Sequence, residues 1–359
     1  MSSFSIVIPT YNEKENIINL IIEIQKEVKD CNYNLIIVDD NSPDQTSEVI
    51  KTYVNENSLK NIICINRSWQ KGLSSAVVEG IASSNSEFVI VMDGDGQHDP
   101  KDILKLINTQ RDQNSDIVIG SRFYNKNSNI MLSRNRSLLS KLGIKVSRLF
   151  IDGKYTDPLT GFFLIKREVI QTIQKEIYKD GFKILFDILM LKKDIQSHEI
   201  QINFRARNAG DSKLNISTTA HLLGQIVENL THKLIPSTFF VFSLIGSMGA
   251  VIHLLILFTL LKMGVGYIVS NIFGSSIALT ANYFLNNYLT FNNLHNSFQS
   301  RLIGLLKYAL FNSLSLMTNI GVASFLYLDN FSIAISTIFG IVAGLLLNYF
   351  LSRNIVFRL

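Results

Sequence analysis

The stretch FVIVMDGDGQHDP, residues 88–100, follows an apolar run with three closely spaced aspartates, Asp93, Asp95 and Asp99. A short run rich in Val, Ile and Phe is typical of a central strand in a parallel sheet covered on both faces. Such sheets bind ligands at the carboxyl ends of their strands. Carboxylates crowded there repel each other unless a cation is present. Oxygen ligands from Asp93, Asp95 and Gln97 therefore predict a divalent metal site, and the alternative is a structural Asp-rich turn.

Apolar strand runs alternate with segments of helical periodicity over residues 1–125. The strand runs are SIVIP, NLIIVDD, IICIN, FVIVMD and DIVIGS. One helix is expected where apolar residues share a face, at Ile17, Leu20, Ile21, Ile24 and Val28. Other helices are expected from Gly72 and after the acidic loop, where Asp99 and Pro100 would be the N-cap and the first helical residue. The alternation predicts an α/β domain with a doubly wound sheet.

The C-terminal third of the 359-residue chain has a different composition. Hydrophobic residues make up 47% of the whole chain, but 237–351 carries only a few charges within long apolar stretches. A span of the hydrocarbon core, roughly 30 Å thick, needs about 20 residues. Four stretches are long enough, at approximately 238–261, 265–287, 303–327 and 331–351. They lack polar helix faces, which argues against a soluble bundle. An all-α transmembrane domain of four helices in two hairpins is expected.

Basic residues predict the orientation of these spans, because loops rich in Lys and Arg stay in the cytoplasm. The relevant cations are Lys233, Arg301, Arg353 and Arg358. The two remaining loops hold little beyond Lys262 and Asp329. Both termini and the α/β domain are therefore expected on the cytoplasmic face. The formal net charge of +5 agrees with contacts to anionic headgroups or phosphates, and the sequence contains no separate nucleic-acid-binding motif.

Two amphipathic segments precede the spans. Residues 130–150 interleave Leu and Ile with cations at Arg134, Arg136, Lys141, Lys145 and Arg148. This pattern is typical of a helix lying on a bilayer surface, although a solvated helix face would have it too. A second such segment, 214–234, leads into the first span. The two segments would hold the α/β domain at the membrane surface.

The apolar region repeats itself. NYFLNNYLTF at 282–291 ends the second span, and NYFLSRNIVF at 348–357 ends the fourth. Chance similarity is common among apolar sequences, but polar Asn282 and Asn348 also match. Two hairpins related by duplication are the simplest account.

Eight motifs resemble, in their order, those of the polyprenyl-phosphate glycosyltransferases, and most of all the dolichol-phosphate mannose synthases. They are IPTYNE, VDDNSPDQT, KGLSSAV, MDGDGQHDP, IGSR, DPLTGFF, GFKI and RNAGDSKL. The likeness runs from residue 4 to about 214, and the rest resembles the GtrA-like membrane domain that some of these enzymes carry. It implies a GT-A (Rossmann-like) catalytic domain over 1–213, an interfacial amphipathic helix over 214–236, and four transmembrane helices in two repeated hairpins over 237–359.

The resemblance also implies roles for individual residues. Asp93, Asp95 and Gln97 match the family's metal ligands, with Mg²⁺ or Mn²⁺ as the cofactor. The acceptor phosphate would be held by Arg122, Arg136 and Ser140, although Arg134 is an alternative to Arg136. The catalytic set is Asp95, Arg122 and Arg136. The donor-binding positions are Pro9, Tyr11, Glu13, Val38, Asp40, Asp93, Gly94, Asp95, Gln97, Arg122, Lys183, Arg207 and Lys213.

The expected reaction is inverting transfer of a hexose, with mannose from GDP-mannose first, to a polyprenyl (dolichyl) phosphate at the cytoplasmic face of the membrane. A phosphate monoester has a second pKa near 6 and is substantially dianionic at neutral pH, so it needs no general base. His98 accordingly has no more than an indirect role. The site must neutralise two approaching anions and stabilise the departing nucleoside diphosphate, which suits a divalent metal and arginines.

Other functions stay open at this point. UDP-glucose or another UDP-sugar could replace the donor, because the hydrogen bonds that select the base cannot be placed from sequence. The membrane domain could instead flip a glycolipid. A processive polysaccharide synthase would need a Q-x-x-R-W type motif on an interfacial helix. This function is disfavoured, because Trp69, the only tryptophan, lies in the early α/β region.

The chain departs from the family at Gly96, where Leu is usual, and at Asp187, where Glu is usual.

Overall fold

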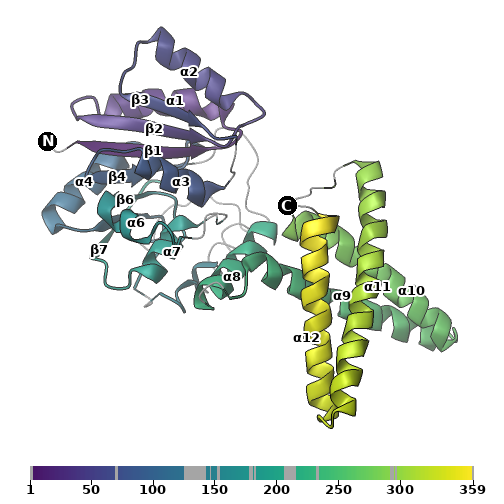
Figure 1. Cartoon of the computed structure of the whole chain (residues 1–359). Helices are drawn as coiled ribbons and strands as arrows, with labels where there is room; N and C mark the ends of the chain where they lie inside the picture. The colour runs from purple at the N-terminus through teal and green to yellow at the C-terminus, as the bar shows by residue number, and fades with distance from the viewer. Residues whose placement is uncertain are drawn as a thin grey trace. The chain divides into compact units, whose positions relative to one another are not determined.

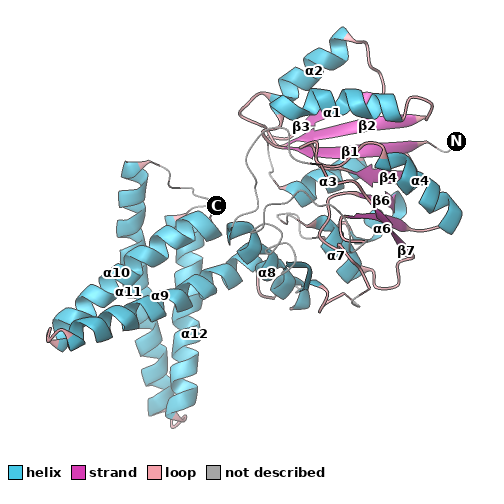
Figure 2. Cartoon of the chain, turned by 180° about the vertical axis from the view of Figure 1, so that it is seen from behind, coloured by secondary structure: helices cyan, strands magenta, loops and turns pink. Residues whose placement is uncertain are grey.

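The computed structural model describes residues 3–68, 72–124, 143–145, 147–151, 154–177, 181, 183–205, 216–231, 234–291, 295 and 297–357. The chain divides into two compact units, Met1–Asn215 and Ile216–Leu359. The first unit contains the sheet, and the second is helical (Figures 1 and 2).

Within the described residues, one seven-stranded sheet organises the first unit, in the order β3-β2-β1-β4-β6-β5-β7. The strands are β1 (Phe4–Thr10), β2 (Tyr33–Asp39), β3 (Ile62–Asn66), β4 (Phe88–Val91), β5 (Ile117–Ser121), β6 (Phe163–Lys166) and β7 (Ser197–Gln201). The other neighbours pair in parallel, whereas β6 runs antiparallel to β4 and β5. The α/β fold is confirmed. The antiparallel β6 was not predicted, and it brings the loop before it to the carboxyl ends of β4 and β5.

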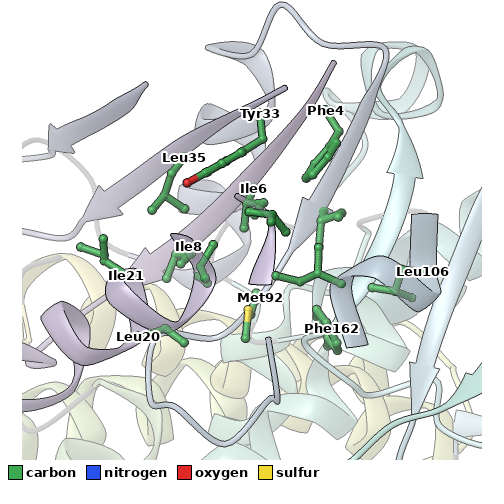
Figure 3. Close-up of a cluster of buried hydrophobic side chains, with 14 of the residues drawn as sticks. Phe4, Ile6, Ile8, Leu20, Ile21, Tyr33, Leu35, Met92, Leu106 and Phe162 are labelled. Atoms are coloured by element: carbon green, nitrogen blue, oxygen red, sulfur yellow. The ribbon is translucent and has the colours of Figure 1, made fainter. Parts of the chain in front are cut away.

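Helices cover both faces of this sheet. They are α1 (Lys14–Glu27), α2 (Thr46–Glu56), α3 (Leu73–Ala82), α4 (Asp102–Gln113), α6 (Arg167–Ile173) and α7 (Ile184–Leu191). On one face, Leu20 of α1 and Leu106 of α4 belong to the core around Ile6 of β1 (Figure 3). On the other face, α3 lies so close that a Cβ at Gly80 would be 2.5 Å from Val7 Cγ1. Alternate residues of β1 therefore face opposite layers, as strand geometry requires.

The acidic loop leads into α4 differently from the prediction. Helix α4 begins at Asp102, so the N-cap role predicted for Asp99 is wrong. The Oδ1 atom of Asp99 instead accepts hydrogen bonds from Lys101 N at 3.0 Å and Arg205 Nη2 at 2.6 Å. The ion pair with Arg205 thus holds Asp99 in a turn ahead of the helix.

The second unit contains α8 (Ile216–Leu230), α9 (Ser237–Lys262), α10 (Tyr267–Leu285), α11 (Phe298–Leu328) and α12 (Ile333–Leu351), and α10 and α12 continue into π-helices, η1 (Asn286–Thr290) and η2 (Ser352–Val356). Four of its helical segments, among the described residues, are long and apolar enough to cross a membrane, as predicted. Large apolar side chains such as Leu255 and Leu306 are exposed on them. Helices apolar all round are suited to lipid.

The two hairpins, α9 with α10 and α11 with α12, carry the repeated segment in the same conformation. In each copy an α-helix changes to a π-helix at the matching position, Asn286 or Ser352. The matching tyrosines reach across to the other hairpin, where Tyr349 hydrogen-bonds Thr238 and the Tyr283 hydroxyl lies against Gly304. A duplicated hairpin would leave this reciprocal arrangement.

Enlarging Gly304 should therefore weaken the second unit. A Cβ at this position would meet the Tyr283 hydroxyl and lie 2.5 Å from His295 Cε1. Tyr283 cannot easily withdraw, because its ring is buried and stacks on Phe357 with ring centroids 5.7 Å apart. We expect Gly304→Ala to destabilise the detergent-solubilised protein by about 1–3 kcal/mol. Gly321→Ala, on the same helix with nothing within 4 Å, should leave the thermal unfolding midpoint unchanged. Equal midpoints for the two variants would contradict this packing.

Hydrogen bonds between described residues join helix α8 to the spans. The backbone N–H of Ser237, at the start of α9, donates to Glu228 Oε2 at 2.8 Å. The Nε2 atom of His221 pairs with the Leu289 carbonyl oxygen of η1 at 2.7 Å. The segment predicted over 214–236 is thus helical over Ile216–Leu230 and fastened to the membrane-spanning helices of its own unit.

Candidate active site

The acidic loop lies at the carboxyl end of β4, beside the ends of β1 and β6. A Cβ at Gly94 would lie 3.0 Å from Thr10 Cγ2 and 3.5 Å from the Pro9 carbonyl oxygen, so the loop packs against the end of β1. A Cβ at Gly161, just before β6, would lie 2.5 Å from Asp93 Oδ2 and 2.7 Å from Asp93 Cγ. Only a glycine leaves room here for the Asp93 carboxylate, whose side chain is 35% exposed.

Hydrogen bonds turn Gln97 so that its amide oxygen can act as a ligand. Its Nε2 atom donates to the Arg205 carbonyl oxygen at 3.2 Å, and the Arg205 backbone N–H donates to the Gln97 carbonyl at 2.8 Å. The Gln97 backbone N–H donates to Asp95 Oδ1 at 3.1 Å. With the amide nitrogen committed to Arg205, Oε1 is the atom of Gln97 suited to a cation.

These residues fit a divalent cation of the hard, oxygen-binding type. In the part of the chain that the structure describes, no group of three or more His, Cys, Asp or Glu side chains could hold a metal alone. Mg²⁺ sites commonly use one or two carboxylates and take their other ligands from water and substrate phosphates. Asp93, Asp95 and Gln97 would form such an incomplete set, which a diphosphate would complete.

Arg122, at the carboxyl end of β5, is held from several directions. Its Nε donates to Asp157 Oδ2 at 2.6 Å, and its Nη2 donates to Asp157 Oδ1 at 2.8 Å. The rings of Phe123 and Phe204 each lie 5.3 Å from its guanidinium carbon. Burial is the largest single influence and would lower the pKa of Arg122, but the charge and hydrogen bonds of Asp157 and the charge of Asp93 together raise this pKa above its ordinary value. Arg122 is therefore a permanent cation in the site.

Lys183 brings a second basic side chain to the same place. Its Nζ donates to the Leu159 carbonyl oxygen at 2.9 Å. Burial and then the positive charge of Arg122 lower the pKa of Lys183, while Asp93, Asp157 and Asp95 act in the opposite direction. An anion bound between Lys183 and Arg122 would relieve this repulsion.

His98 is a packed aromatic group. Its ring stacks on Phe162 with centroids 5.0 Å apart and meets the edge of Phe204 at 5.5 Å. Burial lowers its pKa despite the nearby negative charge of Asp93, whose Oδ2 lies 3.9 Å from His98 Nδ1. A neutral, buried imidazole agrees with the indirect role expected from the sequence.

Two predicted donor-binding residues are engaged inside the domain. Asp40 forms an ion pair with the fully buried Arg67, and its Oδ2 accepts the Gly72 N–H at 2.8 Å. Val38 is buried in β2. Asp40 thus holds the turn before α3, and contacts of Val38 with a nucleoside would come from its main chain.

Glu13 is buried just after β1. Its carboxylate accepts from Asn16 Nδ2 at 2.9 Å, and its backbone N–H donates to Thr46 Oγ1 at 3.1 Å. Tyr11 lies two residues earlier on the same turn and is partly exposed. Both residues therefore lie at the carboxyl edge of β1, close in sequence to Pro9.

Several predicted residues lie outside the described residues: Arg134, Arg136, Ser140, Lys141, Arg207, Lys213, Lys233 and Arg358. In the segment 130–150, only 143–145 and 147–150 are described. Within it, Arg148 donates to the carbonyl oxygens of Tyr155 at 2.6 Å and Thr156 at 2.9 Å. The Arg148 guanidinium is therefore bonded to main-chain carbonyls within the domain, and the bilayer-surface role of the segment 130–150 stays a prediction.

The sequence analysis did not identify four residues that order the site, which are Asp157, Glu199, Arg205 and Glu23. Asp157 holds Arg122, Glu199 of β7 holds the loop of Asp157, and Arg205 joins Asp99 to Glu23 of α1 at 2.6 Å each. Asp157 stands in the DPLTGFF motif and could have been considered. Glu199 and Arg205 stand in no distinctive pattern, and only the fold brings them to the site.

Two family models match the chain. Residues 5–174 match the glycosyl transferase family 2 model, and residues 241–357 match the GtrA/DPMS transmembrane domain model. The dolichol-phosphate mannosyltransferase of Pyrococcus furiosus is 33% identical over 302 residues, covering 83% of this chain and 84% of that protein. The protein of the same name from Mycosarcoma maydis is 30% identical over 239 residues, covering 63% of this chain and 78% of that protein.

Solved structures place the fold. The glucosyl-3-phosphoglycerate synthase of Mycobacterium tuberculosis, in complex with Mn²⁺, UDP and phosphoglyceric acid, matches with a TM-score of 0.51 at 15% identity, over 64% of this chain and 78% of that one. Its complex with Mg²⁺ and UDP also gives 0.51, at 16% identity, over 64% and 79% of the two chains. The chain therefore belongs to the dolichol-phosphate mannosyltransferase family, as a membrane-spanning glycosyltransferase with a GT-A catalytic domain.

Proposed function

We propose that the protein transfers mannose from GDP-mannose to a polyprenyl phosphate, with inversion at the anomeric carbon, at the cytoplasmic face of the membrane. The observation that carries this proposal is the meeting of two kinds of group at one sheet edge. Asp93, Asp95 and Gln97 offer oxygen ligands, and Arg122 and Lys183 offer positive charge beside them. Such a pairing suits a reaction between two phosphate-bearing substrates.

The acidic loop would hold Mg²⁺ or Mn²⁺ together with the donor diphosphate. A bound divalent cation would neutralise the charge that develops on the departing nucleoside diphosphate. Gly94 would let the main chain approach the donor, and Pro9, Tyr11, Glu13 and Asp40 surround the edge where the nucleoside would lie. Lys183 would contact the donor diphosphate, and so would Arg207 and Lys213, which lie outside the described residues.

The acceptor phosphate would lie against Arg122, with Arg136 and Ser140 completing its site. The dianionic phosphate is the nucleophile and needs no base. The chain's task is to bring this anion to the sugar despite the charge of the donor. Arg122 suits that task because Asp157 keeps its guanidinium charged and oriented.

Substituting Arg136 should separate acceptor use from donor use. We expect Arg136→Ala to raise the KM for polyprenyl phosphate by about tenfold or more, the cost of one charge-assisted hydrogen bond, while the KM for GDP-mannose changes little. Steady-state transfer assays with each substrate varied in turn measure both constants. An equal rise in the two constants would place Arg136 outside the acceptor site.

The membrane unit fits a lipid-linked acceptor, because an insoluble polyprenyl chain can be reached only at the bilayer. The cations Arg301 and Arg353 lie at the ends of the spans that the positive-inside rule assigns to the cytoplasm. The catalytic domain and α8 would then lie on the cytoplasmic side, where nucleotide sugars are made.

The test of this function is transfer of label. Membranes containing the full-length protein, Mn²⁺ and a polyprenyl phosphate are supplied with labelled GDP-mannose, and label is counted in the organic phase. Acid-labile lipid-linked mannose, formed in step with GDP, is the expected result. Absence of lipid-linked label, with the protein present in the membrane, would overturn the proposal.

A further inference from the structure

The ion pair between Arg122 and Asp157 has a more definite geometry than charge balance requires. Asp157 is fully buried, and both of its carboxylate oxygens accept from the Nε and Nη2 edge of Arg122. The backbone N–H of Arg122 donates to Asp157 Oδ2 as well, at 3.2 Å. A bidentate pair of this kind fixes the plane of a guanidinium as well as its position.

Two aromatic rings lie close to the same guanidinium. The ring centroids of Phe123 and Phe204 lie 5.3 Å from the Arg122 guanidinium carbon, within the range of cation–π contacts. Asp157 takes one edge and the rings lie near the group. The orientation of the guanidinium is therefore fixed by its contacts before any phosphate binds.

The loop that carries Asp157 is itself held through its main chain. The Glu199 carboxylate accepts from the Thr156 N–H at 2.9 Å to each oxygen, and from the Asp157 N–H at 3.2 Å. The Arg148 guanidinium donates to the carbonyl oxygens of Tyr155 and Thr156. The Glu199 carboxylate thus binds the N–H groups of Thr156 and Asp157, and the Arg148 guanidinium binds the carbonyl groups of Tyr155 and Thr156.

This loop also meets the end of the segment that carries the proposed acceptor residues. Arg148 follows Arg136 and Ser140 in the chain, and its bonds fasten residues 147–151 to the loop of Asp157. The loop 155–157 therefore joins Arg122 to the end of that segment. Neither Asp157 nor Glu199 needs to contact a substrate to act in this way.

We propose that Asp157 is a positioning residue, which fixes the orientation of the Arg122 guanidinium that would bind the acceptor phosphate, and that Glu199 supports it by holding the loop 155–157. The inference rests on the proposed contact between Arg122 and the acceptor phosphate. The role assigned to Asp157 concerns the orientation of the Arg122 guanidinium, beyond the presence of its positive charge.

Asp157→Asn in the full-length protein tests this role. Asparagine has nearly the same shape, but its amide nitrogen cannot accept from Arg122, so one bond of the pair is lost. We expect the KM for polyprenyl phosphate to rise about tenfold or more, the cost of a lost charge-assisted bond, with less than about a twofold change in the KM for the donor. Asp116→Asn is the matched control, because Asp116 lies at the opposite end of β5, where its carboxylate accepts an exposed hydrogen bond from Gln196 N at 3.2 Å.

A double-substitution cycle separates positioning from a purely structural role. If Asp157 acts through Arg122, adding Asp157→Asn to Arg122→Lys should raise the acceptor KM little further, because lysine has no fork to orient. The inference would be overturned if the rise in acceptor KM of the double variant equalled the product of the rises in the two single variants. It would also be overturned if Asp157→Asn raised the KM equally for both substrates. If Asp157→Asn fails to fold, Glu199→Gln replaces it, because this substitution leaves the ion pair intact. Glu199→Gln must then raise the KM for polyprenyl phosphate selectively, by a smaller factor.

The outcomes also distinguish this inference from the function on which it rests. An unchanged acceptor KM in Arg122→Lys would contradict the proposed contact between Arg122 and the acceptor phosphate. The positioning role of Asp157 would then be contradicted as well. Transfer from a different sugar nucleotide, with the selective rise retained, would overturn the proposed donor and leave the role of Asp157 standing.

Discussion

Asp95→Asn should abolish sugar transfer while leaving the fold and membrane insertion intact. Asparagine keeps an oxygen that can accept the Gln97 N–H, so the turn of the acidic loop is retained. It removes the negative charge at the centre of the proposed metal-binding set. Loss of even an outer partner of a metal ligand costs about 10–100-fold, so loss of a ligand charge should cost more than about 100-fold in kcat/KM. Radiolabel transfer and thermal unfolding of the purified variant measure the two properties.

Asp112→Asn provides the matched control, because Asp112 is an exposed residue on α4. It should transfer sugar at the unsubstituted rate. A second measurement on Asp95→Asn is Mn²⁺-dependent binding of GDP, which should weaken together with activity. Full activity of Asp95→Asn would contradict the assignment of this loop to the metal and the donor diphosphate.

Gly161→Ala should impair transfer without altering any residue that would touch substrate. The added Cβ would lie 2.5 Å from Asp93 Oδ2, so the carboxylate must leave its position. Gly161 does not have a left-handed backbone conformation, and alanine would cause no backbone strain there. We expect kcat/KM to fall by about 10–100-fold, as for the loss of a partner that orients a metal ligand, with a far smaller change in stability.

Raising the Mn²⁺ concentration gives this prediction a distinctive signature. A displaced Asp93 weakens metal affinity, so excess Mn²⁺ should restore part of the activity of Gly161→Ala. Gly246→Ala, in open space on α9, should behave like the unsubstituted protein. Wild-type activity for Gly161→Ala would mean that the close approach of β6 to the acidic loop has no role in catalysis.

Local sequence patterns predicted most of the elements, and the sheet order explains what they missed. The apolar runs became β1 to β5, and the apolar stretches became the candidate spans, because both signals depend on neighbouring residues. The antiparallel insertion of β6 depends on pairing between distant segments. No local pattern around Phe163–Lys166 indicates its direction.

The residues of the candidate site also fall into those that local sequence could indicate and those that only the fold brings together. Asp93, Asp95 and Gln97 could be found together because one short loop carries all three. Asp157 and Glu199 reach Arg122 only through the pairing of β5 with β6 and β7, so their roles could not be inferred from spacing. Arg148 is a similar case, since its spacing among apolar residues gave no indication that it bonds the carbonyls of Tyr155 and Thr156.

The most direct test of the central claim is a competition between two donors in one reaction. Membranes containing the full-length protein, Mn²⁺ and polyprenyl phosphate receive GDP-mannose and UDP-glucose that carry different radiolabels, with Asp95→Asn membranes as the blank. Mannose label alone should appear in the organic phase above this blank. Glucose label alone would contradict the proposed donor while keeping the transferase. No label above the blank from either donor would contradict the account at its centre.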